Sequence, residues 1–254
     1  MSSLWPGNGR GRSQLSENQW RPARASPLSR PWIPVISDVT GRFVNASNAT
    51  LLATTDNGHK VVYKPTAGER PLWDFPVETL AAREVLTYEV SQAMGHDIVP
   101  ETVLGNGPYG PGSIQRYIDI DEGFDPVALV QQGSAELWPI AVLDVVTNNA
   151  DRKLGHVISD GTRLLGIDHG LTFHDEDKLR TVLWVFGGRQ LPHGERMALE
   201  RLQTALRNGL SSRVDKLLGS RARASFESRV HGLIRNPVHP SPPDDRPPMP
   251  WPPY

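Results

Sequence analysis

The chain has 254 residues and a mass of 28.1 kDa, enough for one large domain or two small ones. It contains no Cys, which excludes a disulfide scaffold, a thiol nucleophile and a cysteine zinc site. The net charge of −1 argues against a dedicated nucleic-acid binder, and no apolar run reaches the roughly 20 residues that span a bilayer. We therefore expect a cytoplasmic protein without a transmembrane segment.

Proline is concentrated at the two ends of the chain: residues 1–34 contain five, and residues 236–254 contain nine. The first stretch also carries five Arg against a single acid, Glu17. Segments of this composition bury too little apolar surface to fold alone. The sequence therefore predicts a basic disordered tail over 1–34 and a Pro-rich disordered tail over 236–254, the second with the composition of a polyproline ligand.

Between the tails the hydrophobic pattern predicts an α+β protein in two lobes. The expected elements in chain order are strands at 41–45, 49–55 and 59–64, a helix at 78–94, strands at 98–104 and 113–118, a helix at 134–148, a hairpin at 156–167, and helices at 194–208 and 212–235. The first lobe, residues 35–118, is β-rich with one helix. The second, residues 119–235, is mainly helical and carries the small hairpin.

Three groups of polar residues lie at the ends of these elements. Lys64 ends a strand and precedes the helix that contains Glu84. A second group, Asp144 to Lys153, spans the end of a helix just before the hairpin. The third, Asp168-His169-Gly170, follows the second strand of the hairpin. Each group alone is common in proteins, whereas this order, with a hairpin between the last two, is much less expected by chance.

This order resembles the phosphoinositide 3-/4-kinase-like branch of the kinase superfamily, which includes type II phosphatidylinositol 4-kinases and HipA-like kinases. The matching stretches are 144–152 and 166–173, and the resemblance extends over roughly residues 40–185. The whole chain also resembles an actinobacterial group of kinase-like proteins. The resemblance implies a two-lobed kinase-like fold and an ATP-dependent phosphotransferase that uses Mg²⁺ or Mn²⁺ and a hydroxyl acceptor.

The resemblance also implies roles for individual residues. Lys64 would contact the ATP phosphates, and Glu84 would hold Lys64 in place, with Glu78 and Glu89 as less well placed alternatives. Asp151 would orient or deprotonate the acceptor hydroxyl, and Asp168 would hold the metal. Arg152 would fix the catalytic loop by pairing with a carboxylate such as Asp144. Gly170 would let the chain turn after the metal ligand. The residues near the adenine would be Gln115, Arg116 and Tyr117.

The sequence departs from the family pattern at two places. It has no Gly-x-Gly-x-x-Gly loop and no Walker A motif, so that residues 41–48, with Asn45, Ser47 and Asn48, would have to cover the phosphates. In addition, His156 stands five residues after Asp151, where the family carries an Asn metal ligand. Because imidazole suits Mn²⁺ better than Mg²⁺, His156 as a metal ligand predicts a preference for Mn²⁺.

Two other functions are consistent with the same residues. A nucleotide-binding pseudokinase would share the fold without turnover, and the departure at His156 favours it. A metal-dependent hydrolase would instead gather His156, Asp168, His169 and His174 around one ion. For a kinase, we expect a protein or small soluble alcohol as acceptor rather than a lipid, because the core between the tails is acidic and shows no amphipathic insertion.

Two segments are candidates for contacts with the acceptor. The stretch 73–76 carries two aromatic residues, Trp73 and Phe75, before the first helix, and it forms either a flap or a packed corner. Lys178 and Arg180 follow Asp168 where an acceptor-binding segment would lie, and they form either an anion contact or a solvated face.

Overall fold

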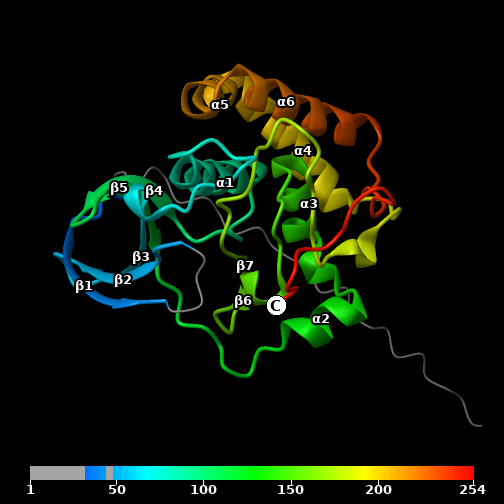
Figure 1. Ribbon diagram of the computed structural model, residues 1–254. Coiled ribbons are helices and arrows are strands. Elements are labelled where there is room, and N and C mark those ends of the chain that lie inside the picture. The colour runs from blue at the N-terminus through cyan, green and yellow to red at the C-terminus, as the bar shows by residue number, and fades with distance from the viewer. Residues whose placement is uncertain (1–31, 44–47) are drawn as a thin grey trace, which may run out of the picture.

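The computed structural model describes residues 32–43 and 48–254, and it confirms the α+β class with a β-rich and a helical part (Figure 1). One antiparallel sheet holds the strands in the order β1-β2-β3-β5-β4. Its members are β1 (Ile36–Arg42), β2 (Leu51–Thr55), β3 (Lys60–Pro65), β4 (Thr102–Gly107) and β5 (Gly110–Arg116). The predicted meander is therefore present, because β1, β2 and β3 pair consecutively.

The sheet is held together by side chains that alternate along its strands. In β2 and β3 every second residue is buried, as expected for strands with one face on a core. The buried residues of this small core are Leu51, Ala53, Val61, Tyr63 and Ile114. The turn between β2 and β3 contains Gly58 at a φ of 82°, a conformation that suits glycine.

Helix α1 (Leu80–Met94) lies between the sheet and the helical part of the molecule (Figure 1). It ends at Gly95, whose φ of 77° allows its N–H to bond back to the carbonyls of Ser91 and Gln92. Leu86, Val90 and Met94 belong to the main hydrophobic core together with residues of the later helices. The helix thus joins the two parts, and it carries Glu84 to their junction.

The helical part is built around α3, which is apolar on nearly all faces and almost completely buried. Its helices are α2 (Pro126–Gln132), α3 (Trp138–Thr147), α4 (His193–Ala205), α5 (Ser211–Leu218) and α6 (Ser220–Arg235). The predicted hairpin is β6 (Val157–Ser159) paired with β7 (Leu164–Gly166). Short 3-10 turns occupy Thr66–Gly68, Ala135–Leu137, Leu154–His156 and Trp184–Phe186, and a kinked π-type turn occupies Leu206–Leu210.

Two helices differ from the expectation. Helix α2 was not predicted, although its Asp125 side chain accepts hydrogen bonds from two N–H groups of the first turn and Gly133 ends it. The single helix expected over 212–235 is interrupted at Gly219, where a φ of 87° separates α5 from α6.

The prediction of a disordered tail over 236–254 is wrong, because this segment packs along the helical part. Val238 pairs with Gln190 in a β-bridge, and His239 is only 1% exposed. Further along, the carbonyl of Pro248 accepts hydrogen bonds from the Thr181 amide and the Trp184 indole. Prolines lack an amide proton but keep a carbonyl acceptor, so donors on the folded part can hold such a segment in place. Residues 1–31 of the predicted basic tail lie outside the described residues.

Candidate functional site

The loop after α3 is anchored by a buried ion pair. Arg152 and Asp144 are both fully buried, and the guanidinium Nε and Nη2 lie 2.9–3.1 Å from the Asp144 carboxylate oxygens. The Nη1 of Arg152 donates to the carbonyls of His156 and Ile167 at 3.1 and 2.9 Å. One side chain therefore ties the end of α3, the loop after it and the strand that leads to Asp168, which is the loop-holding contact that we expected of Arg152.

Lys64 projects from β3 toward two carboxylates. Its Nζ contacts Glu84 Oε1 and lies 2.8 Å from Asp168 Oδ1. Burial lowers the pKa of Lys64, but the charges of Asp168 and Glu84 outweigh burial and raise it above its ordinary value. The charge of Lys64 in turn lowers the pKa of Asp168. Glu89, one of the alternative partners, pairs instead with Arg213.

The backbone conformation of Asp168 directs its side chain toward Lys64. Its φ of 59° is in the left-handed region, which for a residue other than glycine costs about 1–3 kcal/mol and is found mostly at functional sites. The next residue, His169, donates its backbone N–H to Glu84 Oε2 at 3.0 Å, so that Glu84 fixes both Lys64 and this turn. We expected Gly170 to make the turn, but its φ is not positive, and the turn is at Asp168.

His156 and Asp168 face each other across the hairpin. The imidazole Nε2 lies 3.4 Å from Asp168 Oδ2, while Nδ1 lies 3.0 Å from the backbone carbonyl of Asp151. Because a carbonyl only accepts, Nδ1 carries the proton and Nε2 keeps its lone pair. Burial, with Arg152, Lys153 and Lys64 adding to it, lowers the pKa of His156 to about 4. At neutral pH two electron-pair donors therefore face each other, one nitrogen and one oxygen, which are two ligands of the kind that a divalent cation takes.

Asp151 stands at the edge of the same region. Burial raises the pKa of its carboxyl to about 6, with a smaller contribution of the same sign from Asp168, while Lys153 opposes the shift. Its Oδ2 lies 3.4 Å from the Nζ of Lys153. Lys153 belongs to the polar group that follows α3, but the family resemblance implies no role for it; its position two residues after Asp151 places a cation beside the proposed base.

The structure does not bring the remaining predicted nucleotide residues into this cluster. The side-chain amide of Gln115 donates to Thr102 Oγ1 at 2.8 Å inside the sheet, and Lys60 lies over the ring of Tyr117. Arg116 pairs with Glu101. Of the proposed phosphate-covering residues, Asn45 and Ser47 lie outside the described residues, and Asn48 Oδ1 accepts from the Arg70 amide.

The metal cluster of the hydrolase hypothesis does not form. His169 Nε2 accepts from Arg152 at 2.7 Å, and His174 Nε2 points to the carbonyl of Asp74 at 2.8 Å. Among the described residues, no group of three or more His, Cys, Asp or Glu side chains is arranged to hold a metal ion. The histidines of this region thus serve different neighbours, and the structure does not gather His156, Asp168, His169 and His174 around one point as the hydrolase hypothesis expects.

The loop before α1 is a packed corner that carries an exposed aromatic residue. Phe75 packs in a small cluster with Leu80 and Ala150, next to Asp151, and its ring meets His174 edge-on at a centroid distance of 5.1 Å. Trp73 is 92% exposed and lies beneath the Nζ of Lys178, which also pairs with Asp74 at 3.1 Å. The corner hypothesis thus holds for Phe75, and Lys178 faces this loop.

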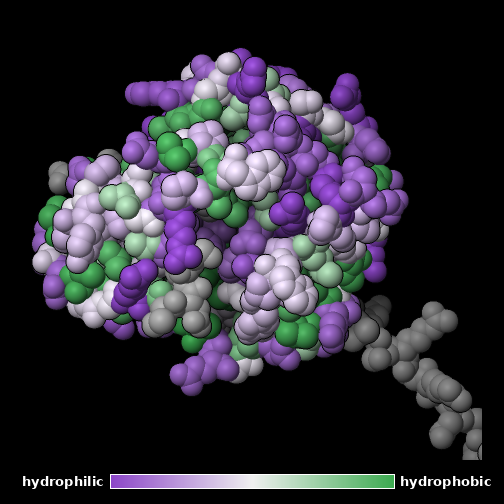
Figure 2. Space-filling model, viewed as in Figure 1, coloured by the Kyte–Doolittle hydropathy of each residue, from purple (hydrophilic) through white to green (hydrophobic). Residues whose placement is uncertain are grey.

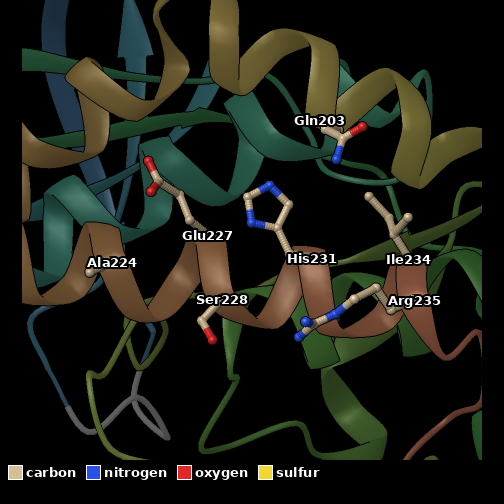
Figure 3. Close-up of a pocket in the computed structure, with 7 residues that line it drawn as sticks. All are labelled: Gln203, Ala224, Glu227, Ser228, His231, Ile234 and Arg235. Carbon is tan, nitrogen blue, oxygen red and sulfur yellow. The ribbon is translucent and has the colours of Figure 1, made fainter.

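A hollow opens beside β7, between the sheet and the helices, and hydrophilic residues line it (Figure 2). A second concavity, with a volume of about 580 Å³, lies away from this region along α6 (Figure 3). There, Glu227 and His231 rise from α6 toward α4, whereas Ser228 points the other way. Charged groups converge around Lys64 and Asp168, not in this second concavity, so the cluster beside β7 is the candidate site.

Comparison with solved structures shows that the chain has a kinase-like fold. The Golgi casein kinase with Mn/ADP bound aligns with a TM-score of 0.53 at 16% identity, over 80% of this chain and 72% of that one. Helicobacter pylori CtkA, a proinflammatory kinase, aligns with a TM-score of 0.51 at 12% identity, over 82% and 95%. Hydra Fam20 aligns with a TM-score of 0.52 at 13% identity, over 81% and 85%. At these identities the likeness establishes the fold alone.

A relative by sequence establishes the family. Protein Rv2133c of Mycobacterium tuberculosis is 35% identical to this chain, over 84% of this chain and 91% of that protein. The chain therefore belongs to the family of protein Rv2133c. No protein-family model matches it. Over the described residues, none of the helices combines the length and the apolar character needed to traverse a bilayer.

Proposed function

We propose that the protein is an ATP-dependent phosphotransferase of the phosphoinositide 3-/4-kinase-like type, which moves the γ-phosphate of ATP to a hydroxyl acceptor. The observation that carries the proposal is the position of Lys64, whose ammonium group contacts both Glu84 and Asp168 at the junction of the two lobes. A cation held by a helix-borne carboxylate and placed beside a second carboxylate suits the binding of phosphates together with a metal.

In this proposal each group of the cluster has one task. Lys64 neutralises phosphate oxygens, and Glu84 keeps its ammonium group in place. Asp168 and His156 hold Mg²⁺ or Mn²⁺, which when bound neutralises charge on the phosphates. The support for the metal site is the pair of facing donors, with the Nε2 lone pair of His156 directed at the Asp168 carboxylate.

Asp151 acts on the acceptor. As the acceptor oxygen forms its bond to the γ-phosphorus and the bond to the β-bridging oxygen breaks, Asp151 takes the acceptor's proton. A carboxyl with a pKa near 6 is mostly ionised at neutral pH and is a better base than an ordinary Asp. Lys153 lies close enough to Asp151 to offset charge there. We propose a protein or small alcohol as acceptor rather than a lipid, because the chain between its two ends carries more acidic than basic residues.

Nucleotide binding by the metal-loaded protein tests the first half of the proposal. We expect ATP with Mn²⁺ to raise the melting temperature of the wild type, and Lys64→Met to weaken ATP binding. Loss of charge-assisted hydrogen bonds worth about 1.5–3 kcal/mol corresponds to a drop of roughly tenfold or more. The matched control is Lys60→Met, since Lys60 is on the same strand but its ammonium group faces the exposed Asp119 and the ring of Tyr117 rather than Glu84 and Asp168. Equal ATP affinity in the two variants would remove Lys64 from the nucleotide site.

A nucleotide-binding pseudokinase is the second candidate, and the replacement of an amide ligand by His156 favours it. A pseudokinase would bind ATP and metal in the same way, but it would not transfer the γ-phosphate. Labelled γ-phosphate, offered with Mn²⁺ to the protein itself and to cell extract, separates the two candidates. Label that becomes covalently attached in an Asp151-dependent manner supports the phosphotransferase, and ATP binding without such label supports the pseudokinase.

A further inference from the structure

The last residues of the chain lie against the loop that follows Asp151. The backbone amide of Leu154 donates to the carbonyl of Pro253 at 2.9 Å. The ring of Tyr254 lies 3.9 Å from the point where a side chain at position 155 would begin. Figure 1 shows this course: the segment leaves α6, runs along the helical part and ends beside β6 and α2. The C-terminus thus reaches the loop that carries the proposed base.

The same segment also contacts the stretch that borders the loop on its other side. The carbonyl of Pro248 accepts from the backbone amide of Thr181 at 3.1 Å and from the indole Nε1 of Trp184 at 2.7 Å. Thr181 is itself joined to Arg152 in a β-bridge. Residues 248–254 therefore span both chain stretches that flank Asp151, which is where an acceptor would approach.

The contacts near the end of the chain have a consistent polarity. Over residues 248–254, the folded part supplies N–H donors from Leu154, Thr181 and Trp184, and the segment supplies the carbonyl acceptors of Pro248 and Pro253. Nearer its root the segment also donates, through the His239 amide to the Arg189 carbonyl and through Arg246 to Asp177. Five of the eight residues over 247–254 are proline, which cannot donate and favours an extended backbone. A groove that binds main-chain carbonyls recognises an extended polypeptide largely independently of its side chains.

The root of the segment is packed among aromatic residues, whereas the large side chains near its end are exposed. His239 is buried among Trp138, Trp184 and Phe186, with centroid distances of 5.9–6.3 Å, and nearby backbone hydrogen bonds join Leu191 to Pro237 and Gly188 to His239. In contrast, Trp251 is 89% exposed and Tyr254 is 67% exposed. Release of the end would break the three hydrogen bonds to Pro248 and Pro253 and uncover Pro250, but it would leave the aromatic packing of the root intact.

We propose that the surface strip that carries the N–H donors of Leu154, Thr181 and Trp184, called the groove from here on, is the docking site for an extended, proline-containing segment of a polypeptide acceptor, and that residues 248–254 occupy it in cis as a built-in competitor. Identification of the docked polypeptide as the phosphate acceptor rests on the phosphotransferase function proposed above. Binding of an extended polypeptide in the groove does not depend on that function. The small-alcohol alternative needs no such groove.

The test begins with binding and needs no catalytic activity. A fluorescein-labelled peptide with the sequence of residues 247–254 is titrated against the full chain and against two shortened chains that end at Pro247 and at Pro250. The second removes only four residues, of which three are exposed, so it remains usable if the first loses stability. A tethered segment acts at an effective concentration of about 1 mM, so for a peptide with a Kd near 0.1 mM we expect the full chain to bind about tenfold more weakly than the chain that ends at Pro247.

Two variants sharpen the result. Trp184→Phe in the shortened chain keeps an aromatic ring but removes the indole donor, and loss of one hydrogen bond predicts roughly fivefold weaker peptide binding. Met249→Ala in the full chain is the control, because Met249 is half exposed and makes no recorded hydrogen bond; we expect the affinity of the unchanged full chain. Equal peptide affinity in the full chain and both shortened chains would overturn the proposal.

Phosphate transfer then tests the acceptor assignment. With a degenerate peptide library that carries Ser, Thr and Tyr, we expect the shortened chains to transfer about tenfold more phosphate than the full chain, for the same reason of competition. Hydrolysis of ATP without peptide should not change. If the shortened chains hydrolyse ATP and bind the peptide but transfer no more phosphate than the full chain, the groove does not bind the acceptor. If no variant uses ATP, the phosphotransferase proposal fails, and the peptide titration alone still decides what the groove binds.

Discussion

His156 donates a hydrogen bond through Nδ1 to the backbone carbonyl of Asp151, 3.0 Å away, and this bond leaves Nε2 facing Asp168 at 3.4 Å. The proposed base and the proposed metal site are thereby linked through one imidazole ring. The bond to Asp151 fixes the tautomer of His156 and directs its free nitrogen at the carboxylate that we propose as a metal ligand.

We predict that His156→Asn shifts metal preference from Mn²⁺ toward Mg²⁺. An amide oxygen is a harder ligand than an imidazole nitrogen, so Mg²⁺ gains relative to Mn²⁺. The measurement is the concentration of each metal that half-saturates ATP binding in wild type and variant. Identical metal preference in both proteins would show that His156 is not a ligand.

The pH response of metal binding follows from the same residue. An unperturbed histidine would lose its metal as pH falls through about 6.5. Burial lowers the pKa of His156 to about 4, so the ring is neutral throughout the range from pH 8 to pH 6. We therefore predict nearly constant Mn²⁺ affinity across this range, followed by a fall only nearer pH 4. A midpoint near 6.5 in the wild type would place His156 in a far more solvated environment than the structure shows.

Asp151 should set the acidic limb of the turnover profile. With its pKa raised to about 6, the carboxyl is able to accept a proton above that pH and is blocked below it, so kcat should fall about tenfold per pH unit in the acid range. Since the charge of Lys153 lowers this pKa, Lys153→Met should move the midpoint upward. If Lys153→Met lowers kcat but leaves the pH midpoint unchanged, Lys153 does not influence the pKa of Asp151.

Asp144 should matter for stability far more than a surface acid does. Asp144→Asn leaves the buried guanidinium of Arg152 without its counter-ion, which typically costs about 3–5 kcal/mol. Glu89→Gln is the matched substitution, because Glu89 pairs with Arg213 near the surface, where such pairs contribute about 0–1 kcal/mol. Urea denaturation of both variants measures the difference. A comparable loss in the two would contradict the structural role of the buried pair.

Acidification should loosen the C-terminal segment. Burial lowers the pKa of His239 in the folded protein; the hydrogen bond to Pro240 and the charge of Asp144 act in the opposite direction but less strongly. Because the released segment takes up a proton near pH 6.5 and the packed one does not, packing weakens as pH falls from about 7 to about 5. Cleavage of residues 236–254 by a protease should accelerate over that range, and His239→Phe should flatten the response. Equal profiles in both proteins would assign the effect to other groups.

Elements that depend on residues close together in the sequence could be predicted from the sequence alone. The alternation in 59–64, the Gly95 stop and the Asp160-Gly161 turn correspond to β3, the end of α1 and the β6–β7 hairpin. Helix α2 was missed although its start and stop residues, Asp125 and Gly133, were visible. The family resemblance directed attention to Lys64 and Asp168, but periodicity alone would not have paired residues 104 positions apart.

The C-terminal segment could not be predicted, for a physical reason. Its composition indicates how poorly it folds alone, whereas its order comes from donors such as Leu154 and Thr181, which lie far away in sequence. In the same way, the low pKa of His156 depends on burial and on three neighbouring cations, Arg152, Lys153 and Lys64. Contacts of this kind arise from the tertiary fold, and no pattern within a short window contains them.

Single-turnover transfer of labelled γ-phosphate, measured with Mn²⁺ in wild type, Asp151→Ala and Asp119→Ala, tests the phosphotransferase proposal most directly. Asp119 is an exposed acid outside the cluster, so its variant controls for the loss of a carboxylate. We predict transfer in the wild type and in Asp119→Ala, and none in Asp151→Ala, with ATP affinity similar in all three. Transfer at a near wild-type rate in Asp151→Ala would contradict the proposed mechanism, and ATP binding without transfer in the wild type would contradict the function itself.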